Sequence, residues 1–155
     1  MRATSSSLLA LAAVVSGLSA QETVFTGETI QIPGTSTQVR VWQEGSALQS
    51  AVSRTAGQWQ RLQQPQYELM LRYAEFDPMV NPPAVPPTLT ADGNNELFYV
   101  QFKSQIIGEY RDGLRAAGAE VHSYLPFQSY LVRMPRSSVD AVRGLPYVRS
   151  VDDFH

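Results

Sequence analysis

The sequence predicts an α+β protein whose last third, residues 97–155, forms one module in the order strand, helix, strand, strand, helix, strand. Residues 97–102 are rich in aromatic and β-branched side chains, which favour strands. In that run Phe98 and Val100 alternate with Tyr99 and Gln101, so one face is expected to be buried. Apolar residues then recur at helical spacing in two places, with further strand-like runs between and after them.

The first helix of the module is predicted by four apolar residues at helical spacing: Ile107, Tyr110, Leu114 and Ala117. Gly118 supplies the stop signal. Apolar runs at residues 121–125 and 130–134 predict a hairpin with its turn at residues 126–128. Ser137 is expected to cap a second short helix. That helix carries Val139, Val142 and Leu145, and residues 148–151 form the closing strand.

Ahead of this module, residues 21–76 are expected to form a small α+β segment. Residues 29–32 and 38–42 alternate weakly and could be short strands. A helix is predicted from five residues at helical spacing, ended by Pro65: Leu48, Val52, Thr55, Trp59 and Leu62. Residues 67–73 alternate as in a half-buried strand.

Residues 77–96 are expected to be a linker between the two parts. Five of the ten prolines lie between Pro78 and Pro87, and this density favours extended polyproline II. A plain spacer is favoured over a proline motif for a recognition domain.

The N-terminus has the pattern of a secretory signal peptide over residues 1–20. Arg2 provides a short basic start, residues 8–15 are apolar, and Leu18-Ser19-Ala20 offers a small-residue cleavage site. The apolar run is too short for a stable membrane anchor. The chain is therefore expected to be secreted or periplasmic, with Gln21 at the mature N-terminus.

Composition and spacing predict no catalytic, metal or cofactor site. Cysteine is absent, which excludes disulfides and thiolate chemistry. His122 and His155 lack metal-ligand spacing, and the Asp152-Asp153 pair alone cannot complete a calcium site. His122 is also the sole interior candidate for a catalytic base. A formal net charge of -2 makes nucleic acid an unfavourable partner.

The predicted element order matches the ferredoxin-like βαββαβ arrangement. Four segments carry a closer resemblance: Phe98-Tyr99-Val100-Gln101-Phe102, Leu114-Arg115-Ala116-Ala117-Gly118-Ala119-Glu120-Val121, Ser129-Tyr130-Leu131-Val132-Arg133 and Leu145-Pro146-Tyr147-Val148-Arg149-Ser150-Val151. In order and spacing they resemble the propeptide domain of secreted subtilisin-like serine peptidases. Phe76-Asp77-Pro78 and Pro83-Ala84-Val85-Pro86 are similar to the lead-in of some bacterial precursors of this kind.

The resemblance implies a non-catalytic module that acts as a folding chaperone and inhibitor of its peptidase. It implies two helices on one face of the sheet, with the other face docked on the peptidase and a C-terminal tail in the substrate groove. The sequence contains no His-Gly-Thr-His and ends directly after the last strand. The chain is therefore expected to be either a truncated precursor or a stand-alone relative that has lost its enzyme. The alternative is an exported interaction or ligand-binding module without a peptidase partner.

The same alternation predicts the partner-binding residues. If Phe98 and Val100 face the helices, an open face on the other side of the sheet should present aromatic and apolar side chains among polar ones. The six candidates are Tyr99, Gln101, His122, Tyr124, Leu131 and Arg133.

Overall fold

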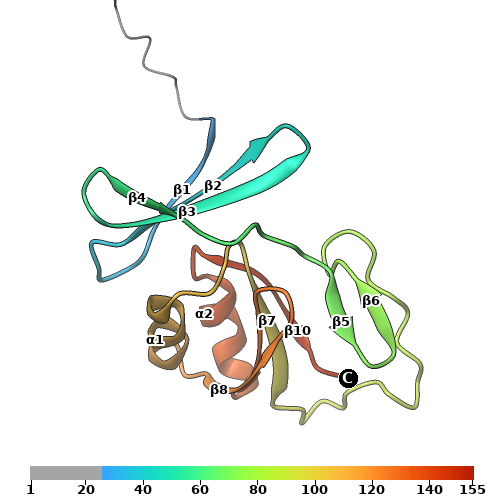
Figure 1. Cartoon of the computed structure of the whole chain (residues 1–155). Helices are drawn as coiled ribbons and strands as arrows, with labels where there is room; N and C mark the ends of the chain where they lie inside the picture. The colour runs from blue at the N-terminus through green and yellow to red at the C-terminus, as the bar shows by residue number, and fades with distance from the viewer. Residues whose placement is uncertain (1–25) are drawn as a thin grey trace, which may run out of the picture.

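The computed structural model describes residues 26–155, which form three antiparallel sheets and two short helices (Figure 1). The chain is thus a mixed α+β protein, as the sequence predicts. The signal peptide predicted at residues 1–20 lies outside the described residues.

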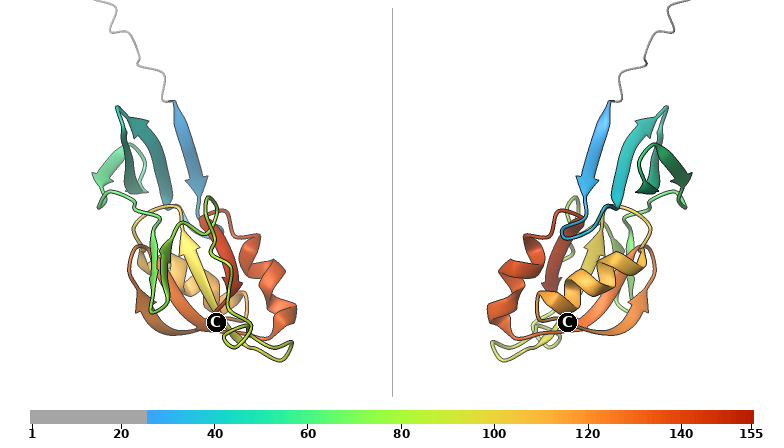
Figure 2. Two further views of the ribbon diagram at one scale, coloured as in Figure 1. Left: turned by 90° about the vertical axis from the view of Figure 1, so that its right-hand side faces the viewer. Right: turned by 90° about the vertical axis from the view of Figure 1, so that its left-hand side faces the viewer.

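The first sheet has four strands in sequential order along the chain. They are β1 (Gly27–Gln31), β2 (Gln38–Glu44), β3 (Ala47–Thr55) and β4 (Gln58–Arg61). Figure 2 shows this sheet at one end of the C-terminal module. The strands predicted at residues 29–32 and 38–42 are confirmed as β1 and β2, with bounds shifted by a few residues.

The helix predicted over residues 48–62 is wrong, because this stretch forms the β3–β4 hairpin. Thr55 pairs with Gln58 across a two-residue turn, in which Gly57 has a φ of 79°. Such a positive φ favours glycine and is incompatible with a continuous right-handed helix. The apolar residues at helical spacing are therefore divided between two strands.

The second sheet contains the last four strands in the order β10-β7-β9-β8, and every neighbouring pair is antiparallel. The strands are β7 (Leu97–Phe102), β8 (Glu120–Leu125), β9 (Ser129–Arg133) and β10 (Val148–Asp153). These four elements confirm the strands predicted for residues 97–155.

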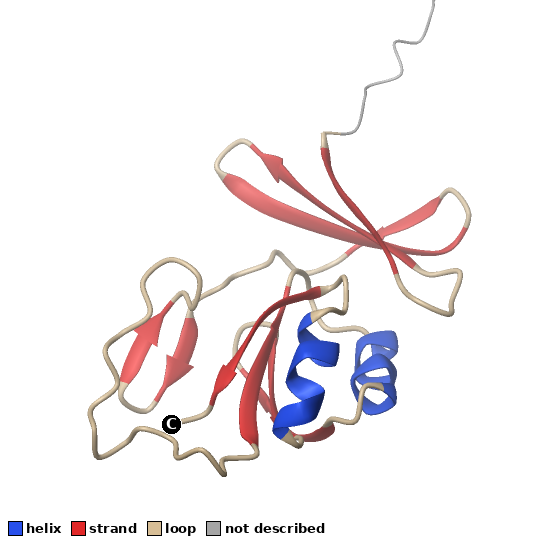
Figure 3. Cartoon of the chain, turned by 180° about the vertical axis from the view of Figure 1, so that it is seen from behind, coloured by secondary structure: helices blue, strands red, loops and turns tan. Residues whose placement is uncertain are grey.

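Two helices cover one face of this second sheet (Figure 3). The first, α1 (Gly108–Ala116), is confirmed, and Gly118 has a φ of 89° just beyond its end. The second, α2 (Val139–Arg143), follows a short 3-10 turn, η1 (Arg136–Ser138). Ser137 lies within that turn, and the residue before α2 is Ser138, which makes no side-chain cap. The predicted capping role of Ser137 is wrong.

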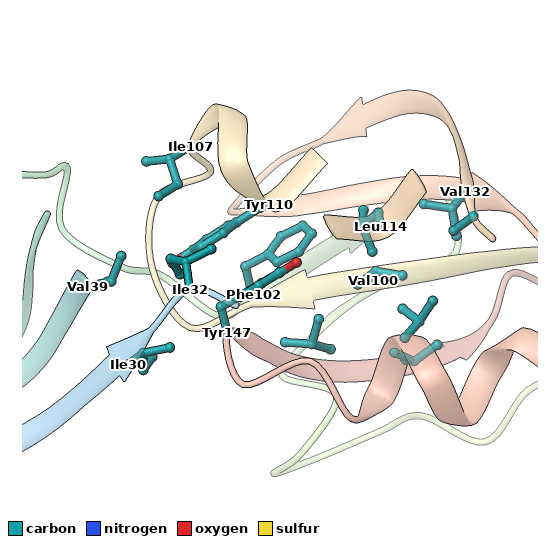
Figure 4. Close-up of a cluster of buried hydrophobic side chains, with 14 of the residues drawn as sticks. Ile30, Ile32, Val39, Val100, Phe102, Ile107, Tyr110, Leu114, Val132 and Tyr147 are labelled. Carbon is teal, nitrogen blue, oxygen red and sulfur yellow. The ribbon is translucent and has the colours of Figure 1, made fainter. Parts of the chain in front are cut away.

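One hydrophobic core joins the helices, the second sheet and the inner face of the first sheet (Figure 4). As predicted, Phe98, Val100 and Phe102 lie in it with the helices. The first sheet and the turn after β1 contribute five buried residues to this same core: Ile30, Ile32, Val39, Val41 and Val52. The N-terminal sheet therefore has no separate core, as expected for a segment too small to bury enough of its own surface.

Gly113 on α1 lies against the stacked rings of Tyr110 and Tyr147, whose centroids are 4.2 Å apart. A Cβ at Gly113 would overlap the hydroxyl of Tyr147, a side chain that is only 1% exposed and cannot easily move aside. Gly113→Ala should therefore destabilise the protein by about 1–3 kcal/mol. An exposed helical glycine would instead gain up to about 1 kcal/mol from the same change.

Gly108→Ala is the matched control, because no atom lies within 4 Å of a Cβ at this position. Urea denaturation of both variants measures the difference. A Gly113→Ala midpoint equal to that of Gly108→Ala would contradict the close packing against Tyr147.

Candidate interaction surface: the second face of the C-terminal sheet

The sheet face opposite the helices is covered by the chain itself. Two short strands, β5 (Leu69–Leu71) and β6 (Ala74–Phe76), form a hairpin on this side (Figure 1). Leu69 and Phe76 form a second buried cluster with Tyr99 of β7. We call this hairpin the covering hairpin. The strand predicted over residues 67–73 is thus shorter, and the chain reverses after Leu71.

Three of the six predicted partner-binding residues are buried on this sheet face. Tyr99 is 5% exposed, Leu131 is 9% exposed and Gln101 is fully buried. The alternation placed these residues on the correct face of the sheet, since Tyr99 pairs with Leu131 across β7 and β9. The prediction that this face is open is wrong, because a segment distant in sequence packs on it.

A bidentate ion pair anchors the end of the covering hairpin. The two terminal nitrogens of Arg149 donate to the two carboxylate oxygens of Asp77, each at 2.8 Å. Arg149 also donates to the side-chain oxygen of Gln101 at 2.6 Å, and its guanidinium lies 3.9 Å from the ring centroid of Tyr67. The amide nitrogen of Gln101 donates to the Tyr67 carbonyl at 3.0 Å. Gln101 is therefore a buried polar residue whose partners come from the cover and from β10.

Burial and pairing act in opposite directions on the pKa of Asp77. Burial alone would raise it, but hydrogen bonds from Arg149 and from the backbone of Met79, with the charge of Arg149, lower it below its usual value. Burial raises the pKa of Tyr67 to about 12. The Asp77 carboxylate is thus held in its charged form, and Tyr67 keeps its proton and donates to the carbonyl of Lys103 at 2.8 Å.

Side-chain amides hold the segment that leads to the hairpin. The side-chain oxygen of Gln105 accepts from the backbone N–H of Gln63 at 2.7 Å. That of Gln128, which is 6% exposed, accepts from the N–H of Gln66 at 3.1 Å. The segment therefore satisfies its backbone groups with module side chains although it forms no ladder with β7 or β9.

His122 is exposed and lies at a β-bulge in β8, between Val121 and Ser123. The extra residue shifts the alternation, so Tyr124 pairs with Tyr130, which lies on the helix-covered face. The prediction that Tyr124 belongs to the opposite face is therefore wrong, although its side chain is 60% exposed. A bulge changes which side chains share a face and is not visible in simple alternation.

Arg133, the sixth candidate, is exposed at the end of β9. The structure thus brings together Tyr99, Gln101 and Leu131 and leaves the other three candidates outside that cluster. Sequence reasoning missed Tyr67, Asp77 and Arg149. The only available signal was an aspartate before Pro78 and an arginine inside the predicted last strand.

The predicted linker has no helix or strand between residues 77 and 96. It is nevertheless attached at several points. Pro83 and Val85 line a small hollow with Tyr99, and the N–H of Ala91 donates to the ring nitrogen Nδ1 of His155 at 2.9 Å. The segment packs along the module, and its mobility and protease sensitivity stay predictions.

In residues 26–155, no group of three or more His, Asp or Glu side chains is arranged to hold a metal ion. Within the same range, no helix has the length and apolar character needed to cross a membrane.

The C-terminal sheet, its two helices and the covering hairpin therefore form a small α+β module in which the chain itself packs on both faces of the sheet. Residues 70–155 match a protein family described as a domain of unknown function (DUF8729), and the chain belongs to this family. The matched range begins at Met70, so most of the covering hairpin lies within the family domain and the first sheet lies outside it. No curated protein and no solved structure matches the chain.

Proposed function

We propose that the chain is a non-catalytic exported module similar to the propeptides of subtilisin-like serine peptidases, which docks on such a peptidase as a folding chaperone or inhibitor. The supporting observation is the strand order β10-β7-β9-β8 with both helices on one face. This order, with the βαββαβ succession, is what a ferredoxin-like arrangement requires. The four resembling segments supply the link to the peptidase.

Docking through the second sheet face requires the covering hairpin to leave. Tyr99 is buried against Leu69 and Phe76 of this hairpin, and Leu131 pairs with Tyr99 on the same sheet face. The Asp77–Arg149 pair holds the cover closed, so its loss should raise the population of molecules with an accessible face. A partner that binds only the uncovered state has its apparent affinity reduced by the fraction of molecules in that state.

A titration of the purified chain into a secreted subtilisin-like peptidase tests this function. Calorimetry follows binding, and substrate turnover follows inhibition. We expect binding that becomes tighter in Asp77→Asn, which weakens the ion pair without changing side-chain shape. Asp112→Asn is the matched control, because its carboxylate is 76% exposed on α1. Absence of binding by the wild type and by Asp77→Asn at micromolar concentration would reject the proposal.

The second candidate is an exported protein-interaction module without a peptidase partner. The observation that favours it is the cover, which fills the face on which a peptidase would dock. The same titration distinguishes the two candidate functions. A module without a peptidase partner should give no heat of binding to the peptidase, either as the wild type or as Asp77→Asn.

Export itself is tested by the mature N-terminus. Cleavage after Ala20 should leave Gln21 as the first residue of the protein recovered outside the cytoplasm. Intact-mass measurement reads this directly, and a mass that retains residues 1–20 would contradict export by a cleaved signal peptide.

A further inference from the structure

The two most exposed large hydrophobic side chains of the described residues are neighbours in the sequence. Met79 is 62% exposed and Val80 is 75% exposed. They lie in a turn that follows the covering hairpin, and neither belongs to the buried cluster around Tyr99. Single exposed apolar residues are ordinary, but two adjacent ones on an ordered turn can contact a partner together.

Hydrogen bonds close this turn on both sides. The Asp77 carbonyl accepts from the N–H groups of Val80 and Asn81 at 3.1 and 3.0 Å. The Asp77 carboxylate accepts from the N–H of Met79, and the Asn81 side chain accepts from the N–H of Asp77, both at 2.9 Å. Pro78 fixes the φ angle at the first of the two central residues of the turn. The two apolar side chains are therefore presented on a short backbone that is already ordered.

The base of the turn is attached to the last strand of the module. The Asp77 carboxylate that closes the turn is the one held by Arg149. Arg149 and Asp77 are 12% and 19% exposed, so this ion pair is largely shielded from water. An ordered turn on a rigid support loses little conformational freedom when it binds, which is the condition for a few side chains to supply most of an affinity.

The base of the turn carries acidic side chains. Glu68 and Glu75 are exposed, and both line a hollow that they share with Asp77, the first residue of the turn. These carboxylates favour a cationic partner and disfavour the anionic surface of a lipid bilayer.

We propose that Met79 and Val80 anchor a partner protein that presents an apolar surface bordered by lysine or arginine. This surface lies outside the sheet face used in the proposed function, and it does not require the covering hairpin to leave. Binding at the turn therefore needs no peptidase and is expected of the molecule in which Arg149 still holds Asp77.

A cationic amphipathic helical peptide built from leucine and lysine is the probe. Fluorescence anisotropy should show saturable binding of the labelled peptide to the full chain. Met79→Ser with Val80→Ser should weaken it about tenfold or more, because two apolar anchors are lost. Tyr124→Ser is the matched control, since Tyr124 is 60% exposed on β8, and it should leave the affinity unchanged. Thermal unfolding establishes that each variant is folded.

Three results would overturn the proposal. They are no saturable binding of the peptide, equal affinity of the wild type and the double variant, or an equal loss in Tyr124→Ser. Vesicles of anionic lipid form a further arm, and binding to them stronger than to the peptide would assign the turn to a membrane surface instead. A chain that binds the peptide and no peptidase would support this anchor while rejecting the proposed function.

Discussion

Val100→Asp should unfold the C-terminal module. Val100 is fully buried at the centre of β7, between neighbours on β9 and β10. An aspartate there would place an unpaired carboxylate among apolar side chains beneath α1 and α2, or would force the strand apart. Either outcome should cost about 4 kcal/mol or more, which places it among the most destabilising single substitutions.

His122→Asp is the control for this substitution, because it places an aspartate at an exposed position on β8, the edge strand of the same sheet. Its effect should stay within about 0.5 kcal/mol. Chemical denaturation followed by far-ultraviolet circular dichroism measures both variants. A Val100→Asp midpoint close to that of the wild type would mean that β7 does not place Val100 in the core.

Arg149→Met should have the second largest effect, because it removes the guanidinium from a cluster with three distinct partners. The Asp77 carboxylate, 19% exposed, would lose both charge-assisted hydrogen bonds. The side-chain oxygen of Gln101 would lose its donor, and the Tyr67 ring would lose its cation. Breaking a largely buried pair in this way should cost about 3 kcal/mol.

The loss of stability in Arg149→Met should be concentrated in the covering hairpin and the segments that flank it. Limited proteolysis should cut residues 62–96 faster in the variant, while residues 97–155 stay resistant. Arg133→Met is the control, since Arg133 is an exposed arginine on the same sheet. Equal cleavage rates in the two variants would show that Arg149 does not hold the cover.

Acid should reproduce the loss of this ion pair. The pKa of Asp77 in the folded protein lies below its usual value of 3.8. The stabilisation is therefore fully present above about pH 4 and is lost as the pH falls through the lowered pKa. Cleavage within residues 62–96 should rise over this acidic range in the wild type and should depend less on pH in Asp77→Asn. An identical acid profile for both proteins would remove Asp77 from the explanation.

Local pattern predicted the C-terminal module well because its elements follow local rules. Residues 97–102 are rich in aromatic and β-branched side chains, and α1 is followed by a glycine with positive φ. The prediction for the N-terminal segment failed where helical spacing of apolar residues competed with a turn signal. Leu48, Val52 and Trp59 fit a helix, but Gly57 in the middle of the run was the stronger signal and marks a hairpin turn.

The candidate site depended on information that alternation does not contain. Tyr99 and Gln101 were assigned to the correct face, yet their burial is caused by Leu69, Phe76 and Tyr67, about thirty residues earlier. Pairing between distant segments leaves no periodic trace in a single sequence. The bulge at His122 is equally silent, because one extra residue reassigns every side chain after it without changing the composition of the strand.

The Asp77–Arg149 pair joins residues that are 72 positions apart, and this distance orders events in time. A ribosome adding roughly 5–20 residues per second makes Arg149 several seconds after Asp77. During that interval the residues of the hairpin have been synthesised, but β10 and its Arg149 have not. The ion pair that secures the hairpin can therefore form only after the last strand has been made. Until then, only apolar contacts such as those of Leu69 and Phe76 can hold the hairpin over Tyr99.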